Sequence, residues 1–349
     1  MSALGSHRST FPKKWRQIRE NLPTFSEKSP CFQPWSPTRE TFCEKSRIFA
    51  PSTSPLHMKL YFLGTGTSSG IPQMGCSCAV CTSSDPRDRR SRCSALLETD
   101  DHHLLLIDCG PDFRSQMLRF IAEHPFGAGT LPYHERRVAE MSDEQARAAG
   151  LHEAPRTPYA VPALDAVLLT HEHFDHVAGL DDLRPLSHFN AIEVWAEPNV
   201  AAPILQHMGY CFGKQHYPGS PQLTMHEFDI NLPFTVAGTT VTPIRVMHGR
   251  LPIAGFRIGD LAYMTDLSTL PESEWPKLLG VRTLVVSALR HEPHNTHQTI
   301  EQAIDMARRV GAARTYFIHM CHQAGRQCEA DAQLPEGMAY AYDGLDIEC

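Results

Sequence analysis

Short apolar runs separated by loops dominate the chain from Met58 onward. In several of them apolar and polar residues alternate, as over residues 59–63, which is typical of β-strands. We predict strands over residues 60–63, 94–98, 104–107, 166–169, 192–195, 241–246, 261–264, 283–286 and 315–318. Helical patterns predict helices over 112–123, directly after His176, near 272–279 and over 299–310, with Thr296 or Thr299 as the N-cap of the last.

Many strands with interspersed helices predict an α/β (α+β) sandwich, in which two sheets lie between outer helices. We assign residues 58–349 to one domain of this kind. Residues 124–162 interrupt the strand pattern and are predicted to be a surface insertion, partly helical over 142–149. Residues 1–57 lack a sustained apolar period and are predicted to be a largely disordered extension, with the functional protein beginning at Met58. A targeting peptide is the alternative, but acidic residues such as Glu20 and Glu27 argue against it.

The composition restricts the choice of partners and of compartment. A hydrophobic share of 42% and a charged share of 20% are typical of a soluble globular protein. Because the formal net charge is −7, neither nucleic acid nor an anionic membrane is expected as a partner. No apolar run reaches the length of a membrane span. Eleven cysteines in 349 residues do not form a dense disulfide framework, so a reducing, cytoplasmic location is expected.

The richest local chemistry lies in the hexad His171-Glu172-His173-Phe174-Asp175-His176, directly after an apolar run. Imidazole and carboxylate are ordinary ligands of zinc and related divalent ions. His171 and His173 alternate along an extended segment, so both can face one ion. Asp175 and His176 lie where the chain is expected to turn, and can face a second ion. A polar turn that is rich in histidine by chance is the weaker interpretation.

Further candidate ligands stand just past the ends of predicted strands. They are Asp108, His171, His248, Asp266 and His319. Strand ends on one side of a sheet bring residues that are distant in sequence to one edge. Each residue alone is more often a cap or a satisfied polar group, but five in series around the hexad indicate a metal site.

These motifs resemble those of the metallo-β-lactamase superfamily. The hexad matches its His-x-His-x-Asp-His signature, and the strand-end residues occur in the order of its other motifs. The resemblance covers about residues 58–325 and implies an αββα sandwich with a dinuclear metal centre. It assigns His171, His173 and His248 to one ion, and Asp175, His176 and His319 to the other. Asp266 would bridge the two ions, and Asp108 would orient a ligand histidine.

A second cluster is formed by Cys76-x-Cys78-x-x-Cys81, which supplies three thiolates. The fourth ligand is expected from the segment after His319, where His322 is the first candidate and Cys321 the rival. Three cysteines and one histidine without an open position are typical of structural zinc. Three reduced cysteines without a metal are the alternative interpretation.

The cysteine motif beside an intact hexad is similar to that of PhnP-type phosphodiesterases, which open phosphoribosyl 1,2-cyclic phosphate. PqqB-like proteins share the cysteines but resemble versions without the full hexad. In such relatives a histidine before the next helix contacts the scissile phosphate, and His297 best matches that place. Ser287 occupies the position where some relatives carry a partner carboxylate, and Arg290 is a candidate phosphate contact.

The resemblance therefore implies hydrolysis of a small or cyclic phosphodiester by a metal-bound hydroxide. Two zinc or manganese ions would serve the reaction with Asp175, Asp266 and His297 as catalytic residues, and one zinc would be structural. A ribonuclease Z-like nuclease, a thioester or lactone hydrolase and a non-catalytic, zinc-stabilised binding protein are the alternatives. Homodimers are common among these relatives, so a homodimer is a further expectation.

Overall fold

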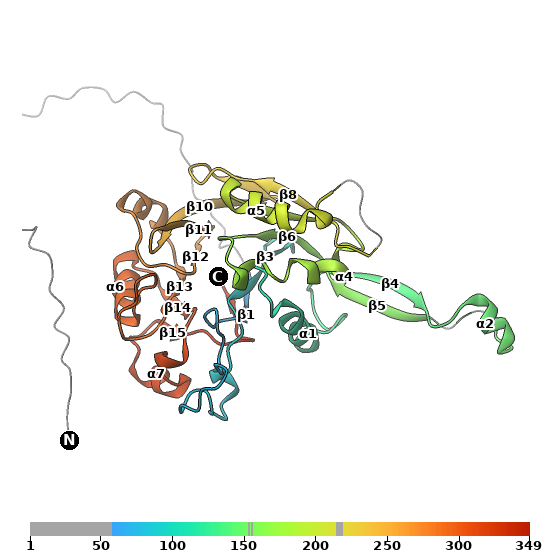
Figure 1. Cartoon of the computed structure of the whole chain (residues 1–349), viewed down its shortest axis with the longest axis horizontal. Helices are drawn as coiled ribbons and strands as arrows, with labels where there is room; N and C mark the ends of the chain where they lie inside the picture. Colours follow the sequence, from blue (N-terminus) through green and yellow to red (C-terminus); the bar gives the residue numbers. More distant parts are fainter. Residues whose placement is uncertain (1–57, 153, 155, 214–218) are drawn as a thin grey trace, which may run out of the picture. The chain divides into compact units, whose positions relative to one another are not determined.

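Two seven-stranded sheets form the centre of the computed structural model (Figure 1). The structure describes residues 58–152, 154, 156–213 and 219–349, which belong to the compact unit Ser54–Cys349. The predicted extension over 1–57 lies outside the described residues. The first sheet has the order β16-β1-β2-β3-β6-β7-β8. Its strands are β1 (Lys59–Gly64), β2 (Ser94–Glu98), β3 (Leu104–Ile107), β6 (Leu164–Leu168), β7 (Ile192–Ala196), β8 (Leu223–Glu227) and β16 (Asp346–Glu348).

The second sheet has the order β15-β14-β13-β12-β11-β10-β9. Its strands are β9 (Phe234–Val236), β10 (Thr239–His248), β11 (Leu251–Ile258), β12 (Leu261–Met264), β13 (Thr283–Ser287), β14 (Arg314–Ile318) and β15 (Met338–Tyr340). Strands β12 to β15 are parallel, whereas β9 to β12 are joined as antiparallel neighbours.

Three apolar cores lie between the four layers of the fold, which are an outer layer of helices, the first sheet, the second sheet and another outer layer of helices. Along β1, Tyr61 and Leu63 face a core beneath the helices of the first sheet, while Leu60 and Phe62 face the space between the two sheets. This alternation follows from the two-residue period of a strand. The third core lies between the second sheet and its helices. The structure thus confirms the predicted sandwich of two sheets with helices outside.

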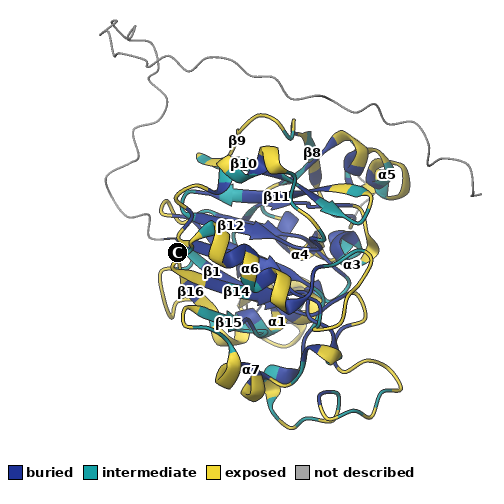
Figure 2. Ribbon diagram, turned by 90° about the vertical axis from the view of Figure 1, so that its left-hand side faces the viewer, coloured by how far each residue is buried: buried dark blue, intermediate teal, exposed yellow. Residues whose placement is uncertain are grey.

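The helices cover the outer faces of the sheets (Figure 1). The first sheet is covered by α1 (Phe113–Glu123), α3 (Phe174–Val177), α4 (Arg184–Ser187) and α5 (Pro198–Met208), and the second by α6 (Ile300–Val310) and α7 (Gln327–Gln333). In α6 the N-cap is Thr299, whose hydroxyl accepts from the amide of Gln302. Ile300, Ala303 and Ala307 face the core, and the opposite side of α6 is exposed (Figure 2).

The predicted insertion is a two-stranded hairpin, β4 (Tyr133–Ala139) with β5 (Arg156–Pro162), which pair only with each other. A short helix, α2 (Asp143–Ala148), lies within the predicted helical stretch at the far end of the hairpin (Figure 1). The helix expected near 272–279 is instead a 3₁₀ helix, Glu272–Leu278, which contains Pro276. Among the described residues no helix has the length and apolarity that a bilayer span requires.

The carboxyl ends of β1, β3 and β6 lie at one edge of the sandwich, where the candidate site is found. Strand β2 is antiparallel to both β1 and β3, so β1 and β3 run in the same direction, and β6 is parallel to β3. Their carboxyl ends therefore lie at one edge, together with the start of β2. At this edge the amide of Ala254 donates to the carbonyl of Thr170 at 3.0 Å, which joins the second sheet to the first.

Candidate metal centres

Asp108, Asp266 and His319 leave their strands in left-handed backbone conformations, with φ of 59°, 52° and 58°. This conformation is uncommon for residues other than glycine and costs on the order of 1 kcal/mol, although aspartate tolerates it better than most. The left-handed conformation changes the direction of the chain directly after each of these strands. Backbone strain at three of the five predicted strand-end residues indicates a functional constraint at this edge.

His173 and His248 form one side of the cluster, with ring centroids 5.2 Å apart, and His171 lies 4.5 Å from His173. The strand that carries His248 was predicted to end at residue 246. In the structure β10 continues to His248, which pairs with Leu251 across a tight turn. The Nδ1–H of His248 donates to the carbonyl of Thr296 at 2.9 Å, so Nε2 is the nitrogen with a free lone pair.

Asp175, His176 and His319 form the other side. Nε2 of His176 lies 3.4 Å from Oδ2 of Asp175, and Nε2 of His319 lies 3.9 Å from the same oxygen. Nδ1 of His176 donates to Asp108 at 2.7 Å. Asp108 also accepts from the amide and hydroxyl of Thr170, so it fixes His176 relative to the chain just before His171.

Asp266 lies between the two sides. Its Oδ1 is 3.1 Å from Nε2 of His319 and 3.3 Å from Nε2 of His176. Its Oδ2 faces Nε2 of His171 at 3.9 Å, and one of its oxygens lies within 4.8 Å of ligand atoms of both His173 and His248. This is the position that a bridging carboxylate requires.

The charges of the cluster stabilise one another. Burial lowers the pKa of His171 well below its usual value. Burial also lowers the pKa of His176, but Asp266 and Asp108 outweigh it and raise that pKa well above the usual value. Burial raises the pKa of Asp266, yet His319 and His176 hold it well below its usual range. The carboxylates thus favour positive charge at this point, which a divalent cation can supply.

Five imidazole nitrogens in the cluster are buried without a hydrogen-bond partner among the described residues. They are Nε2 of His171, His176 and His319, and Nδ1 of His297 and His319. A buried polar atom without a partner is costly, and imidazole nitrogens facing carboxylates are good ligands for divalent ions. The donor set therefore fits the two divalent ions that the sequence predicts.

His297 belongs to the same cluster. Its ring centroid lies 4.6 Å from that of His248 and 4.9 Å from that of His319, and it has a ligand atom within 4.8 Å of one from Asp266. Burial and the neighbouring His319 lower the pKa of His297 to about 3, so its ring is neutral at pH 7.

Arg290, the candidate phosphate contact, and Ser287 both have partners within the protein. The guanidinium of Arg290 donates to the carbonyls of Glu292 and Pro293 and to the side chain of Gln323. Arg290 therefore holds its own loop together instead of extending a free fork for phosphate. Ser287, at the place of a carboxylate in some relatives, accepts from the amide of Leu267 and supports the turn after Asp266.

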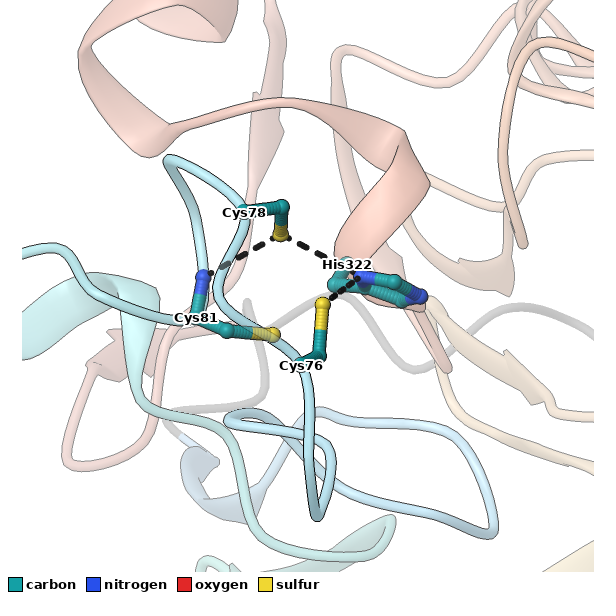
Figure 3. A group of neighbouring side chains, drawn as sticks. All are labelled: Cys76, Cys78, Cys81 and His322. Carbon is teal, nitrogen blue, oxygen red and sulfur yellow. Dashed lines mark hydrogen bonds between the residues drawn. The ribbon is translucent and has the colours of Figure 1, made fainter.

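The structure brings together Cys76, Cys78, Cys81 and His322, with ligand atoms within 4.8 Å of one another (Figure 3). Nδ1 of His322 lies 3.3 Å from Sγ of Cys76 and 3.3 Å from Sγ of Cys78. Cys321, the rival ligand, is buried outside this group, and its amide donates to the carbonyl of Leu289. The geometry thus favours His322 as the fourth ligand.

The pKa values of two thiols in this cluster are shifted in opposite directions. The Cys81 amide and His322 lower the pKa of Cys78 to about 6, while burial raises the pKa of Cys81 to about 11. Three cysteine sulfurs, which bind zinc as thiolates, and one imidazole are the donor set of a closed tetrahedral zinc site.

A single segment serves both clusters, because His319 and His322 are three residues apart. Between them the amide of Met320 donates to Thr65, and the amide of Thr67 donates to Met320. Two supporting contacts were not predicted from the sequence. Thr170, which holds Asp108, directly precedes the hexad, a position that could have suggested its role. The backbone carbonyl of Thr296 leaves no signal in a sequence.

The chain matches a family model and several known proteins. A model described as "Beta-lactamase superfamily domain" matches residues 142–320. A curated relative named "Octanoyltransferase", from Porphyromonas gingivalis (strain ATCC BAA-308 / W83), is 41% identical over 290 residues, which are 83% of this chain and 51% of that protein. The chain therefore spans about half the length of this relative.

Solved structures agree with the fold. The structure described as "a New Diphosphatase from the PhnP Family" has 34% identity and a TM-score of 0.66, and the match covers 84% of this chain and 97% of that one. Zn²⁺-bound PqqB from Methylobacterium extorquens has 20% identity and a TM-score of 0.61, with 83% and 100% of the two chains covered. The second similarity supports the fold alone.

Proposed function

This chain belongs to the β-lactamase superfamily, and from that premise we propose that it is a metal-dependent hydrolase that cleaves a small or cyclic phosphodiester. The hydrolase class is supported by the superfamily and by the 34% identity to a PhnP-family diphosphatase. The phosphodiester is supported by one observation above all: Asp266 presents its two oxygens to two groups of histidines. Paired divalent sites of this kind suit in-line displacement at phosphorus.

The residues divide into two ligand groups around Asp266. His171, His173 and His248 would hold one ion, and Asp175, His176 and His319 the other. When bound, two divalent ions lower the pKa of water and offset negative charge on phosphoryl oxygens. Asp108 keeps Nε2 of His176 directed into the site, and the carbonyl of Thr296 does the same for His248. No side-chain nucleophile is needed.

His297 is proposed to contact the phosphate and to protonate the departing alkoxide. Its ring lies beside His248 and His319, within the cluster. Because its pKa is about 3 in the protein alone, the proton must be gained when an anionic substrate binds next to the ring. The acidic role is therefore linked to substrate binding.

The direct test uses bis(p-nitrophenyl) phosphate with Mn²⁺ or Zn²⁺. The purified protein is expected to hydrolyse it, and His171→Ala and Asp175→Ala should each abolish the reaction. Asp181→Ala is the matched control, since Asp181 pairs with Arg184 on the surface. Activity that persists in both ligand variants would contradict the proposal. A panel of ribose cyclic phosphates, 2′,3′-cyclic nucleotides and linear diesters would then identify the substrate.

Acyl hydrolysis is a second candidate because one relative is named as an octanoyltransferase. The match covers only 51% of that protein, so the octanoyl transfer can reside in its other half. Hydrolysis of an octanoyl thioester should be measured in the same panel. Thioester turnover that exceeds turnover of every phosphodiester would favour this candidate.

Cleavage of precursor tRNA receives less support. The hairpin β4–β5 carries Arg136 and Arg137, but Glu135 and Glu140 lie beside them. The guanidinium of Arg136 lies over the ring of Tyr159 at 5.0 Å, so it is engaged within the protein. Salt-dependent cleavage of a precursor tRNA would favour the nuclease. A protein that holds metal yet hydrolyses nothing in the panel would favour the non-catalytic alternative.

A further inference from the structure

The hairpin of β4 and β5 extends away from the two large sheets and carries α2 at its far end (Figure 1). Its base packs on the body, where the ring of His134 stacks on that of Phe189. Beyond the base, residues 135–139 of β4 are exposed. A two-stranded hairpin alone is at best marginally stable in water, and a third strand would stabilise it. Such a strand could pair with the outer edge of β4 or with the outer edge of β5.

The register of the hairpin shows which backbone groups point outward. Just before β4, the amide of Ala163 donates to the carbonyl of Pro132 at 3.0 Å, so these two opposite residues form a hydrogen-bonded pair. Hydrogen-bonded and non-hydrogen-bonded pairs alternate along an antiparallel ladder. Every second residue of β4 therefore directs its amide and carbonyl away from β5. These residues are Tyr133, Glu135, Arg137 and Ala139.

The two outer edges differ in their capacity to pair with another strand. On β5 the same alternation places Pro158 and Pro162 at outward positions. Proline has no N–H to donate, and prolines on an edge strand prevent further pairing. On β4 none of the outward positions is a proline, so each of them presents both a donor and an acceptor. The edge of β4 is therefore the open one.

The charges of β4 complement themselves. If a second copy of β4 pairs antiparallel about Arg136, Glu135 of each copy lies opposite Arg137 of the other, as two-fold symmetry requires. Both residues point their backbone groups outward, so this register also forms the backbone hydrogen bonds. A shift by two residues would place Arg137 opposite Arg137, or Glu135 opposite Glu135. Like charges directly opposite are destabilising, so the charges select one register.

The side chains concerned are free to pair in this way. Glu135 and Arg137 are exposed, and within the described ranges neither side chain has an ion pair or a hydrogen bond. Arg136 would face Arg136 of the second copy across the axis. Its guanidinium, however, lies over the rings of Tyr159 and Phe189, at 5.0 and 5.5 Å from their centroids. These cation–π contacts hold its charge within its own copy.

We propose that the open edge of β4 pairs with the same edge of a second copy of this chain, in the register that places Glu135 opposite Arg137. The strands β5 and β4 of both copies then form one continuous four-stranded sheet across a two-fold axis. Val138, which is 41% exposed, is covered opposite His134 of the second copy. For the homodimer expected above, this is a specific interface that can be tested residue by residue.

The experiment measures the dimer Kd of the full chain by sedimentation equilibrium. Glu135→Arg and Arg137→Glu each replace two attractive pairs by two repulsive ones, so each should raise the Kd by about tenfold or more. In a 1:1 mixture of the two variants both pairs are attractive again, and a heterodimer should form with the wild-type Kd. The matched control is Arg147→Glu, at an exposed arginine of α2 outside β4, which should keep the wild-type Kd.

Recovery of the dimer in the mixture also shows that both variants are folded. A wild type that stays monomeric at the highest concentration would overturn the inference. Single variants that dimerise as the wild type does would also overturn it, because the interface would then lie elsewhere. A mixture that stays monomeric would contradict the pairing of Glu135 with Arg137. None of these outcomes depends on the proposed hydrolysis.

Discussion

The two ligand clusters are built in different ways, although one short segment contributes to both. The histidine–aspartate cluster, which we propose holds two ions, takes its side chains from strand ends of both sheets and from α3, and His171, His176, Asp266 and His319 are almost fully buried. The cysteine cluster takes three ligands from one loop and one from a 3₁₀ turn, and all four are half-buried. Ligands fixed by a sandwich do not need the metal in order to converge, whereas a loop does. The first cluster should therefore govern reactivity and the second should govern stability.

The largest effect is expected at Asp266. In Asp266→Asn the bridging charge is lost while the shape is kept, so several kcal/mol of transition-state stabilisation should disappear and kcat should fall by about 10³-fold. Thermal stability should change much less. The check is steady-state kinetics with bis(p-nitrophenyl) phosphate together with a thermal melt, with Asp181→Asn as the surface control. If Asp266→Asn instead lowered the thermal stability and left the activity of the folded protein unchanged, this cluster would govern stability and not reactivity.

The opposite pattern is expected for the cysteine cluster. Cys76→Ser should remove the zinc and destabilise the fold by about 3–5 kcal/mol, because the energy of binding structural zinc contributes to folding. For a domain of this size that corresponds to a fall in Tm of about 10 °C. Differential scanning calorimetry measures it, and Cys328→Ser, at an exposed cysteine, provides the control. An unchanged Tm would show that the loop needs no metal.

The residues of both clusters could largely be predicted from the sequence. Residues that follow apolar strands meet at one edge of a sheet, so their position in the chain was enough to predict that Asp108, His171, His248, Asp266 and His319 converge. The cysteine motif could be recognised because its three ligands are nearly adjacent. Choosing between Cys321 and His322 required the path of the chain after β14, which residue spacing does not determine.

Other features were missed for physical reasons. Strand β11 contains Pro252 and Gly255, residues that normally interrupt strands. In the fold Gly255 is required by packing, since a Cβ there would lie 2.8 Å from Met264. The pairing of β4 with β5 inside the predicted surface insertion leaves no strand signal in the sequence, because five consecutive positions of β4, from Glu135 to Ala139, are exposed and show no apolar alternation. Left-handed backbone at Asp108, Asp266 and His319 leaves no sequence pattern.

A smaller effect within the dinuclear cluster is expected at Asp108. Asp108→Asn removes the charged acceptor that orients His176, and residues that orient ligand histidines typically contribute about 10–100-fold in metal affinity. Metal titration with a competing chelator should detect this loss. A control is Asp112→Asn, which changes a carboxylate that pairs with Arg92 and does not contact a ligand histidine. Equal affinities in Asp108→Asn and the wild type would mean that the sandwich alone orients His176.

The smallest effect concerns the reactivity of one thiol. The pKa of Cys78 is lowered to about 6, so after zinc is removed by a chelator its thiolate persists above pH 6 and is lost as the pH falls below it. Alkylation by iodoacetamide should therefore be fastest at Cys78 at pH 7, and half-maximal near pH 6. Cys81, whose pKa is raised to about 11, should react slowly at both pH 6 and pH 7. Mass spectrometry of the labelled peptides distinguishes the two, and equal labelling would contradict the assignment.

Metal counting tests the division between the two clusters most directly. We expect three divalent ions per chain in the wild type by inductively coupled plasma mass spectrometry. The His171→Ala/Asp175→Ala double variant should retain one zinc, and the Cys76→Ser/Cys81→Ser double variant should lose that zinc and retain the other two ions. A single ion in the wild type, or loss of the same ion from both variants, would contradict the existence of two independent centres.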